Sequence, residues 1–295
     1  MITPQEKNNK LKKTLKLKAD LYIKREDKHP LGSHKGRSLP IMVAYHIKSG
    51  WRNFVISSSG NAAIAAAQSI KKYNKKTKNK LTLTIFIGKK IDLEKKKIIK
   101  KLLDKNIFLK QTNNPKQQAF QMEKNKMAKN LRQSTDNSSL IGYEQLAKEL
   151  ATIKNLSAVF IPTSSGTTAE GLYRGFKKLK INPQIHIVQT DACHPLADAM
   201  EQKIRPTVKT LSLASAIVDK IAHRTKTVTE AAKKSRGNAW VVNNKEIKEA
   251  LKIYKKTNQK DSPSPNSILS LAGLIQADHK KWPLGETIVC LFTGK

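Results

Sequence analysis

Short apolar runs rich in β-branched residues alternate along this chain with longer amphipathic segments. The runs that read as strands fall at 20–24, 53–57, 81–87, 106–110, 158–162, 184–190, 239–242 and 287–292. Several are apolar on both faces, which is typical of strands that helices cover on both sides. Helical periodicity fills the intervals at 62–73, 92–105, 144–153, 169–180 and 245–256. Strand–helix alternation of this kind predicts an α/β fold with a mainly parallel sheet.

The chain carries a large positive charge. Its 295 residues include 57 Lys and Arg against 22 Asp and Glu, which gives a formal net charge of +35. Only eight of these cations are Arg, although bidentate contacts to bases and phosphates favour Arg. The lysines are spread along the chain together with many Asn and Ile. We therefore interpret the charge as a composition-wide bias, which allows weak, salt-sensitive attraction to polyanions without a specific nucleic-acid partner.

Cysteine content and hydropathy restrict the class of protein further. The two cysteines, Cys193 and Cys290, lie in no CxxC or His-rich cluster, so the sequence predicts no metal site. Two thiols cannot form the disulfide framework of a small secreted domain. The basic N-terminal segment has no apolar stretch behind it, and no run approaches the ~18 apolar residues of a membrane span. We expect a cytoplasmic protein without a membrane partner.

The loops that follow the strands are the first place to look for chemistry, because ligands of α/β sheets bind outside the carboxyl ends of the strands. In the segment 21–38, Lys35 follows a Gly-Ser-His turn and begins a segment that reads as a helix. The helix macrodipole disfavours an ammonium group at that end and so favours an uncharged or imine-linked nitrogen. Imine formation is how a lysine nucleophile captures an aldehyde cofactor. An ordinary surface cation is the alternative.

Two further loops are rich in small and hydroxyl-bearing residues. Ser57–Ala63 reads SSSGNAA and lies between a strand and an Ala-rich helix, where it is either an anion site or a plain helix cap. Ile161–Gly171 reads IPTSSGTTAEG, and its hydroxyls and main-chain donors suit a phosphate at the next helix N-terminus. It lacks the Gly-Lys-Ser/Thr ending of a nucleotide-triphosphate loop, so a compact phosphate is the better candidate.

These motifs, in this order, resemble those of the fold-type-II pyridoxal-phosphate (PLP) enzymes, which include threonine synthase, serine/threonine dehydratase, cysteine synthase and the tryptophan synthase β chain. The resemblance implies that Lys35, in GSHK, is the Schiff-base lysine. It implies that the substrate carboxylate is bound by Ser58, Ser59, Gly60 and Asn61, with Asn61 also meeting the ring oxygen of the cofactor. It implies that the cofactor phosphate is held by Ser164, Ser165, Gly166, Thr167 and Thr168. Thr293, in LFTGK, would meet the pyridine nitrogen.

The same resemblance implies two domains with mainly parallel twisted sheets flanked by helices. Residues 1–38 and 144–295 would form the large cofactor-binding domain, and residues 39–143 a smaller mobile domain. The implied activity is that of a PLP-dependent lyase or synthase most like threonine synthase. It would act on a small amino acid by α-proton abstraction and β- or γ-elimination or replacement, in a homodimer. Serine/threonine dehydratase and cysteine synthase are the alternatives within the class. A basic nucleic-acid-binding protein and a catalytically silent PLP-fold protein are the alternatives outside it.

Some residues depart from the family's pattern. Gly36 stands where many relatives have an acidic or larger residue, and His34 is more similar to the tryptophan synthase β chain. Ser264 lies where relatives often place a Glu-Pro pair, so a carboxylate near the site could be absent. The charged run 24–27 either orients the Lys35 loop or is a strand-end cluster, and Cys193 and His194 follow a strand that could border the site.

Overall fold

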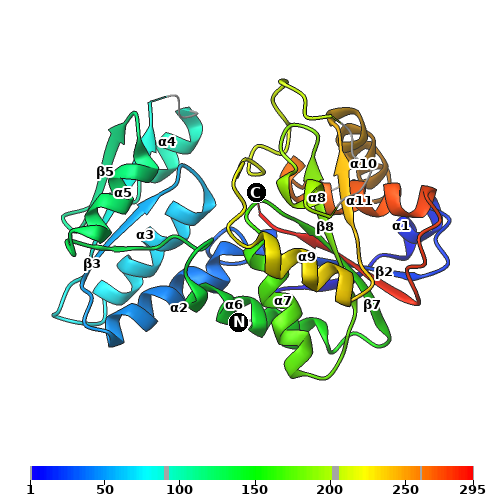
Figure 1. Ribbon diagram of the computed structural model, residues 1–295, viewed down its shortest axis with the longest axis horizontal. Helices are drawn as coiled ribbons and strands as arrows, with labels where there is room; N and C mark the ends of the chain where they lie inside the picture. Colours follow the sequence, from blue (N-terminus) through cyan, green and yellow to red (C-terminus); the bar gives the residue numbers. More distant parts are fainter. Residues whose placement is uncertain (1, 90–92, 201–205, 260, 295) are drawn as a thin grey trace. The chain divides into compact units, whose positions relative to one another are not determined.

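The computed structural model describes residues 2–89, 93–200, 206–259 and 261–294. The chain divides into two compact units. Unit 1 comprises Met1–His29 and Gly142–Lys295, and unit 2 comprises Pro30–Ile141. Each unit contains one sheet with helices on its faces (Figure 1). The predicted α/β class with mainly parallel sheets is confirmed.

Unit 1 is built on a six-stranded sheet in the order β1-β2-β10-β7-β8-β9. Its strands are β1 (Gln5–Lys7), β2 (Asp20–Arg25), β7 (Leu156–Pro162), β8 (Gln184–Thr190), β9 (Ala239–Val242) and β10 (Thr287–Phe292). All neighbours pair in parallel except β1, which pairs antiparallel with β2 at one edge. The carboxyl ends of the five parallel strands therefore lie along one edge of the sheet, where ligands of such sheets bind.

Helices cover both faces of the unit 1 sheet. They are α1 (Asn9–Thr14), α6 (Leu140–Leu150), α7 (Thr167–Lys178), α8 (Pro195–Asp198), α9 (Thr225–Lys234), α10 (Asn244–Thr257) and α11 (Pro265–His279). The central strand β10 is buried along its whole length. Its Ile288, Cys290 and Phe292 pack in the same core cluster as α10 and α11, whereas Val289 and Leu291 pack with α6, α7 and α9. This alternation explains why the run TIVCLF is apolar throughout.

Unit 2 has a four-stranded parallel sheet in the order β5-β4-β3-β6. Its strands are β3 (Asn53–Ser57), β4 (Thr82–Gly88), β5 (Ile107–Thr112) and β6 (Lys129–Asn130), and its helices are α2 (Lys35–Lys48), α3 (Asn61–Asn74), α4 (Leu93–Lys100) and α5 (Pro115–Lys124). Side chains of α2, α3 and α4 share one core cluster, while α5 packs with Val55 and Phe86 in a second, smaller cluster. The predicted helix that was to start at Asp92 begins outside the described residues and is observed from Leu93.

The boundary between the units falls earlier than the sequence prediction placed it. Residues 30–38 were expected to belong with the larger domain, but the structure groups them with unit 2. The physical reason is that they run without interruption into α2, whose Leu39 and Met42 pack in the unit 2 core. Cofactor binding by the larger domain and mobility of the smaller one stay predictions.

Candidate active site

Lys35 is the first residue of α2 in unit 2. The segment before it is a turn in which the backbone N–H of Lys35 donates to Ser33 Oγ at 3.3 Å. The Lys35 side chain is half-buried, and its Nζ forms no hydrogen bond or ion pair with any residue that the structure describes. This amine is half-buried, has no carboxylate partner and lies at the positive end of a 14-residue helix, so its positive charge does not stabilise the fold. It is well suited to covalent capture of an aldehyde.

The SSSGN segment forms the turn between β3 and α3 in unit 2. Gly60 is the N-cap residue of α3, and its N–H donates to Ser58 Oγ at 3.3 Å. Within the described chain no side chain caps this helix, so its first N–H groups point toward a potential acceptor. Short connections make α2 and α3 both run opposite to β3, so both helices begin at the carboxyl end of that strand. Lys35 and Asn61 therefore share one edge of the unit 2 sheet.

The third predicted loop, Ser164–Gly166, joins β7 to α7 in unit 1. Gly166 is the N-cap residue and has a φ of 89°, in the left-handed region that disfavours a side chain. A Cβ at this position would also lie 2.6 Å from Val228 Cγ2. Glycine is required here for both reasons, and its conformation turns the chain sharply from the strand into the helix.

The hydroxyls of this loop surround the start of α7. Ser164 Oγ accepts from the N–H groups of Val218 and Asp219, each at 3.2 Å, and so holds the segment that contains these two residues against the loop. Ser165 Oγ lies 3.0 Å from Thr167 Oγ1. Thr168 is only 7% exposed, yet its hydroxyl bonds to none of the residues that the structure describes. The Thr168 hydroxyl and the main-chain N–H groups at the start of this 12-residue helix suit a phosphate dianion.

A buried ion pair supports the same loop and was not anticipated from the sequence. Glu170, in the first turns of α7, accepts from Arg224 Nη1 at 2.9 Å and from Thr227 Oγ1 at 2.8 Å. Glu170 and Arg224 are both more than 90% buried. Because removal of one partner would leave an unpaired buried charge, this pair fixes α7 against the start of α9. The residues are 54 positions apart, so no local signal reveals their contact.

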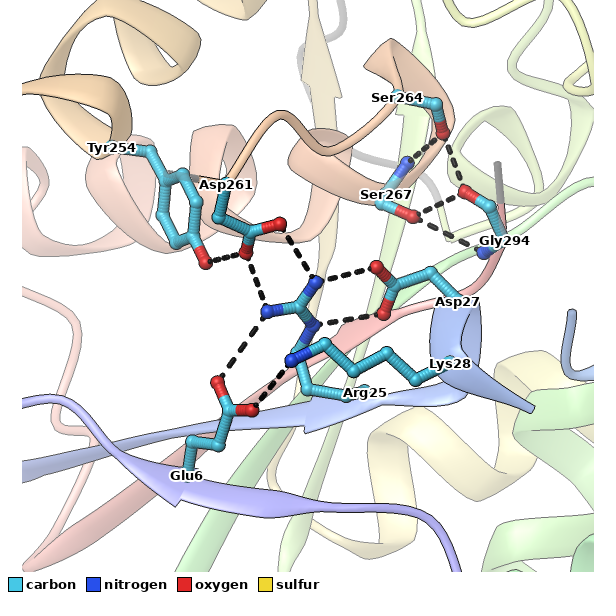
Figure 2. A network of polar contacts seen from close by, with 9 residues as sticks. All are labelled: Glu6, Arg25, Asp27, Lys28, Tyr254, Asp261, Ser264, Ser267 and Gly294. Atoms are coloured by element: carbon cyan, nitrogen blue, oxygen red, sulfur yellow. Dashed lines mark hydrogen bonds and ion pairs between the residues drawn. The ribbon is translucent and has the colours of Figure 1, made fainter. Parts of the chain in front are cut away.

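Thr293 directly follows β10 and is 5% exposed. The next residue, Gly294, is held by two serines at the start of α11 (Figure 2). Its carbonyl accepts from Ser264 Oγ at 2.6 Å and from Ser267 Oγ at 2.7 Å, and its N–H donates to Ser267 Oγ at 3.1 Å. Thr293 and the Ser164–Gly166 loop thus lie at the same carboxyl edge of the unit 1 sheet, since β10 and β7 are parallel neighbours.

The charged run 24–27 is buried, and Arg25 is the centre of a network in unit 1 (Figure 2). Its guanidinium forms two bonds with Asp27, at 2.9 and 2.7 Å, and two with Asp261, at 2.5 and 3.1 Å. Tyr254 Oη donates to Asp261 at 2.7 Å. Burial alone would raise the pKa of the Asp261 carboxyl, but the hydrogen bonds from Arg25 and Tyr254 outweigh it and lower that pKa.

The remaining polar candidates have structural partners. His194 is buried just beyond β8, where its Nδ1 lies 2.9 Å from Asp198 Oδ1 and its Nε2 lies 3.0 Å from Thr207 Oγ1. Cys193 is also buried. Across the described ranges, no group of three or more His, Cys, Asp and Glu side chains could hold a metal ion. None of the helices in the described part of the chain has the length and apolarity needed to cross a bilayer.

The donors described above fit PLP. An uncompensated lysine amine suits its aldehyde, and the hydroxyl-rich start of α7 suits its phosphate. The structure therefore defines an α/β protein of two units, each with polar, donor-rich turns at the carboxyl edge of a parallel sheet. The sequence matches the family of pyridoxal-phosphate dependent enzymes over residues 2–294, and the chain belongs to that family.

Individual relatives agree with this assignment. A threonine synthase from Methanocaldococcus jannaschii is 27% identical over 322 residues, which cover 99% of this chain and 74% of the relative. Among solved structures, a PLP-dependent aspartate racemase superposes with a TM-score of 0.83 at 18% identity, covering 100% of this chain and 90% of that one. Threonine deaminase isoform 2 from Solanum lycopersicum gives 0.81 at 20% identity, covering 99% and 83%. At these identities the structural matches show a shared fold.

Proposed function

We propose that this protein is a PLP-dependent lyase or synthase most like threonine synthase. It would act on an amino acid by α-proton abstraction and β- or γ-elimination or replacement. The observation that supports this choice over other members of the family is the similarity to a threonine synthase along 99% of the chain. The cytoplasmic location and the homodimer remain predictions from the sequence.

Each proposed residue has a separate task. Lys35 carries the cofactor and, once its amine is released, removes the α-proton as general base. The turn Ser58–Asn61 binds the substrate carboxylate through its hydroxyls and main-chain donors, with Asn61 also directed at the cofactor ring. The loop Ser164–Thr168 holds the phosphate, and the Thr293 hydroxyl donates a hydrogen bond to the ring nitrogen. When bound, the cofactor supplies the electron sink for the carbanion.

The hydroxyl of Thr293 affects which reaction the bound cofactor favours. A threonine cannot transfer a full proton to the ring nitrogen as a carboxylic acid does, so the nitrogen stays neutral. A neutral ring withdraws electrons less strongly, which favours departure of a β- or γ-leaving group over transamination. The threonine deaminase and aspartate racemase folds leave a dehydratase or a racemase as the competing activities.

Borohydride reduction of the PLP-loaded protein, followed by peptide mapping, tests the assignment of Lys35. We expect the cofactor on the Lys35 peptide and loss of the visible band of lysine-bound PLP in Lys35→Ala. Turnover should fall by roughly 10²-fold or more, the usual share of a general base. Lys48→Ala, at the exposed far end of the same helix, is the matched control and should change neither. Cofactor on another lysine, with full turnover in Lys35→Ala, would refute the assignment.

A substrate panel separates the activities. O-phosphohomoserine, L-threonine, L-serine, L-aspartate and O-acetylserine should be supplied in turn to the loaded enzyme. Threonine plus phosphate indicates a threonine synthase, and keto acid plus ammonia indicates a dehydratase. Cysteine plus acetate, formed from O-acetylserine when sulfide is also supplied, indicates a cysteine synthase, and inversion at the α-carbon indicates a racemase. We expect threonine and phosphate from O-phosphohomoserine, and a faster reaction with any other substrate would overturn the choice of synthase.

A further inference from the structure

The strongest unexplained feature of unit 1 is the double serine contact on Gly294. The ladder between β10 and β2 ends at Phe292, and Gly294 lies in an isolated β-bridge, so Thr293 has a paired residue on either side. The position of Thr293 therefore depends in part on what holds Gly294. Ser267 is completely buried and binds both the carbonyl and the N–H of Gly294, while Ser264 binds the carbonyl from a second direction (Figure 2).

The two serines are themselves fixed. Ser264 is the N-cap residue of α11 and accepts from the Ser267 N–H at 3.4 Å, so both hydroxyls belong to one helix turn. Three residues before Ser264, Asp261 is bound by Arg25. Arg25 in turn belongs to β2, where it pairs with Phe292 of β10, and its guanidinium carbon lies 5.7 Å from the centre of the Phe292 ring.

These contacts form a closed circuit around Thr293. The circuit runs from Arg25 on β2 to Asp261, through the turn to Ser264 and Ser267, across to Gly294 and back along β10 to β2. A hydrogen-bonded circuit of this kind, in which Arg25 and Ser267 are buried, restricts the backbone more than a single bond does.

We propose that Ser264 and Ser267 are positioning residues that hold the Thr293 hydroxyl in place for the ring nitrogen of the cofactor, with the Arg25–Asp261 pair fixing the turn that carries them. This inference rests on the proposed function.

Four substitutions separate positioning from simple stability. Ser267→Ala removes both bonds to Gly294. Ser264→Asp keeps an N-cap acceptor but has no proton to donate to the Gly294 carbonyl. Ser264→Thr keeps both functions and is the rescue variant. Ser270→Ala is the matched control, since Ser270 is equally buried on the same helix and its hydroxyl bonds to the Ser267 carbonyl within the helix, not to Gly294.

The readouts are the PLP affinity of each apoprotein by fluorescence titration, the visible spectrum of the bound cofactor, and the urea midpoint of the apoprotein. We expect Ser267→Ala and Ser264→Asp to weaken PLP binding roughly three- to tenfold, the range of one lost hydrogen bond, and to shift the spectrum. Ser264→Thr and Ser270→Ala should retain the wild-type affinity and spectrum. If Ser267→Ala does not fold, Ser264→Asp against Ser264→Thr decides the matter.

The outcomes also distinguish this inference from the proposed function. Wild-type protein that binds no PLP, or binds it away from Lys35, refutes the proposed function whatever the serine variants do. Wild-type protein that binds PLP at Lys35, with Ser267→Ala and Ser264→Asp matching Ser270→Ala in affinity and spectrum, refutes the positioning role alone.

Discussion

His186 shows how burial decides the behaviour of a single residue. It is fully buried in unit 1, stacked on Phe160 with 4.4 Å between the ring centres. Its Nδ1 accepts from the Asn238 N–H and from Trp240 Nε1, both at 3.1 Å, so the proton lies on Nε2, which donates to Gln184 Oε1 at 2.8 Å. Burial lowers the pKa of His186 from 6.5 to about 3, so the folded protein keeps this ring neutral.

His186 should therefore make the protein sensitive to acid. Below pH 6.5 the unfolded chain takes up a proton on this ring while the folded chain does not, so the unfolded state gains stability as the pH falls. The loss continues until the pH reaches about 3 and should amount to about 2 kcal/mol between pH 7 and pH 5. The free energy of unfolding in urea at both pH values measures it.

A non-titrating variant isolates this contribution. His186→Asn keeps an acceptor near the position of Nδ1 and should be less stable at pH 7 because it loses the ring contacts. Its stability should nevertheless fall about 2 kcal/mol less than that of the wild type on going to pH 5. Equal losses in the two proteins would contradict the assignment of the acid sensitivity to His186.

At the candidate site, the sequence predicted the functional residues only where they lie next to one another in a short motif. GSHK, SSSGN and SSGTT are local motifs, and each was found at the start of a helix after a turn, as the residue pattern indicated. The Ser267–Gly294 and Arg25–Asp261 contacts join residues 27 and 236 positions apart. Such contacts depend on strand order, which periodicity does not supply.

At the scale of elements, the turn from β7 into α7 depends on one glycine. Gly166→Ala would place a methyl group 2.6 Å from Val228 Cγ2 and would force a non-glycine residue to a φ of 89°. A left-handed residue costs about 1–2 kcal/mol, and overpacking adds a similar amount. We expect Gly166→Ala to lower the free energy of unfolding by about 3 kcal/mol, measured in urea.

Two further variants divide the strain into its parts. In a Val228→Ala background the steric contribution should disappear, so Gly166→Ala should cost about 1–2 kcal/mol less than in the wild type. Gly60→Ala is the matched control, because Gly60 also caps a helix but has a φ of −137°, and a Cβ added there would meet nothing within 4 Å. A loss at Gly60 as large as that at Gly166 would mean that the turn conformation is not the cause.

Elements were predictable in proportion to how regular their patterns are. All eight predicted strands are present, because buried parallel strands have continuous apolar runs. The missed strands β1 and β6 have three and two residues, and only their pairing with β2 and β3 defines them. Among the helices that the structure describes, four were missed: α1, α5, α8 and α9. Helices α1 and α8 have only six and four residues, and α5 is largely polar and buries only Ala119. Helix α9 is amphipathic and buries Val228, Ala231 and Ala232, so its pattern was available in the sequence and was overlooked.

At the scale of the whole molecule, the charge of +35 is the property that remains unassigned. Two explanations are a binding patch for an anionic partner and a composition-wide bias, and the exposed face of α10 illustrates both. Lys248, Lys252, Lys255 and Lys256 are exposed and line an open hollow on this helix, which could be read as a binding patch. Like charges three and four residues apart on a helix also repel one another, which an anionic partner would relieve. A composition-wide bias instead gives attraction that does not depend on any one group of lysines.

We expect the composition-wide explanation to hold. Two DNA duplexes of unrelated sequence should bind with similar affinity by fluorescence anisotropy, and the affinity should fall at least tenfold between roughly 50 and 200 mM salt, as it does for contacts to phosphates alone. Replacing the four α10 lysines with Gln should weaken binding only slightly. Replacing Lys72, Lys75, Lys76 and Lys78, which are exposed in unit 2, removes the same charge and should have the same effect. Loss of binding with the α10 set alone, or a strong preference for one duplex, would instead identify α10 as a nucleic-acid site.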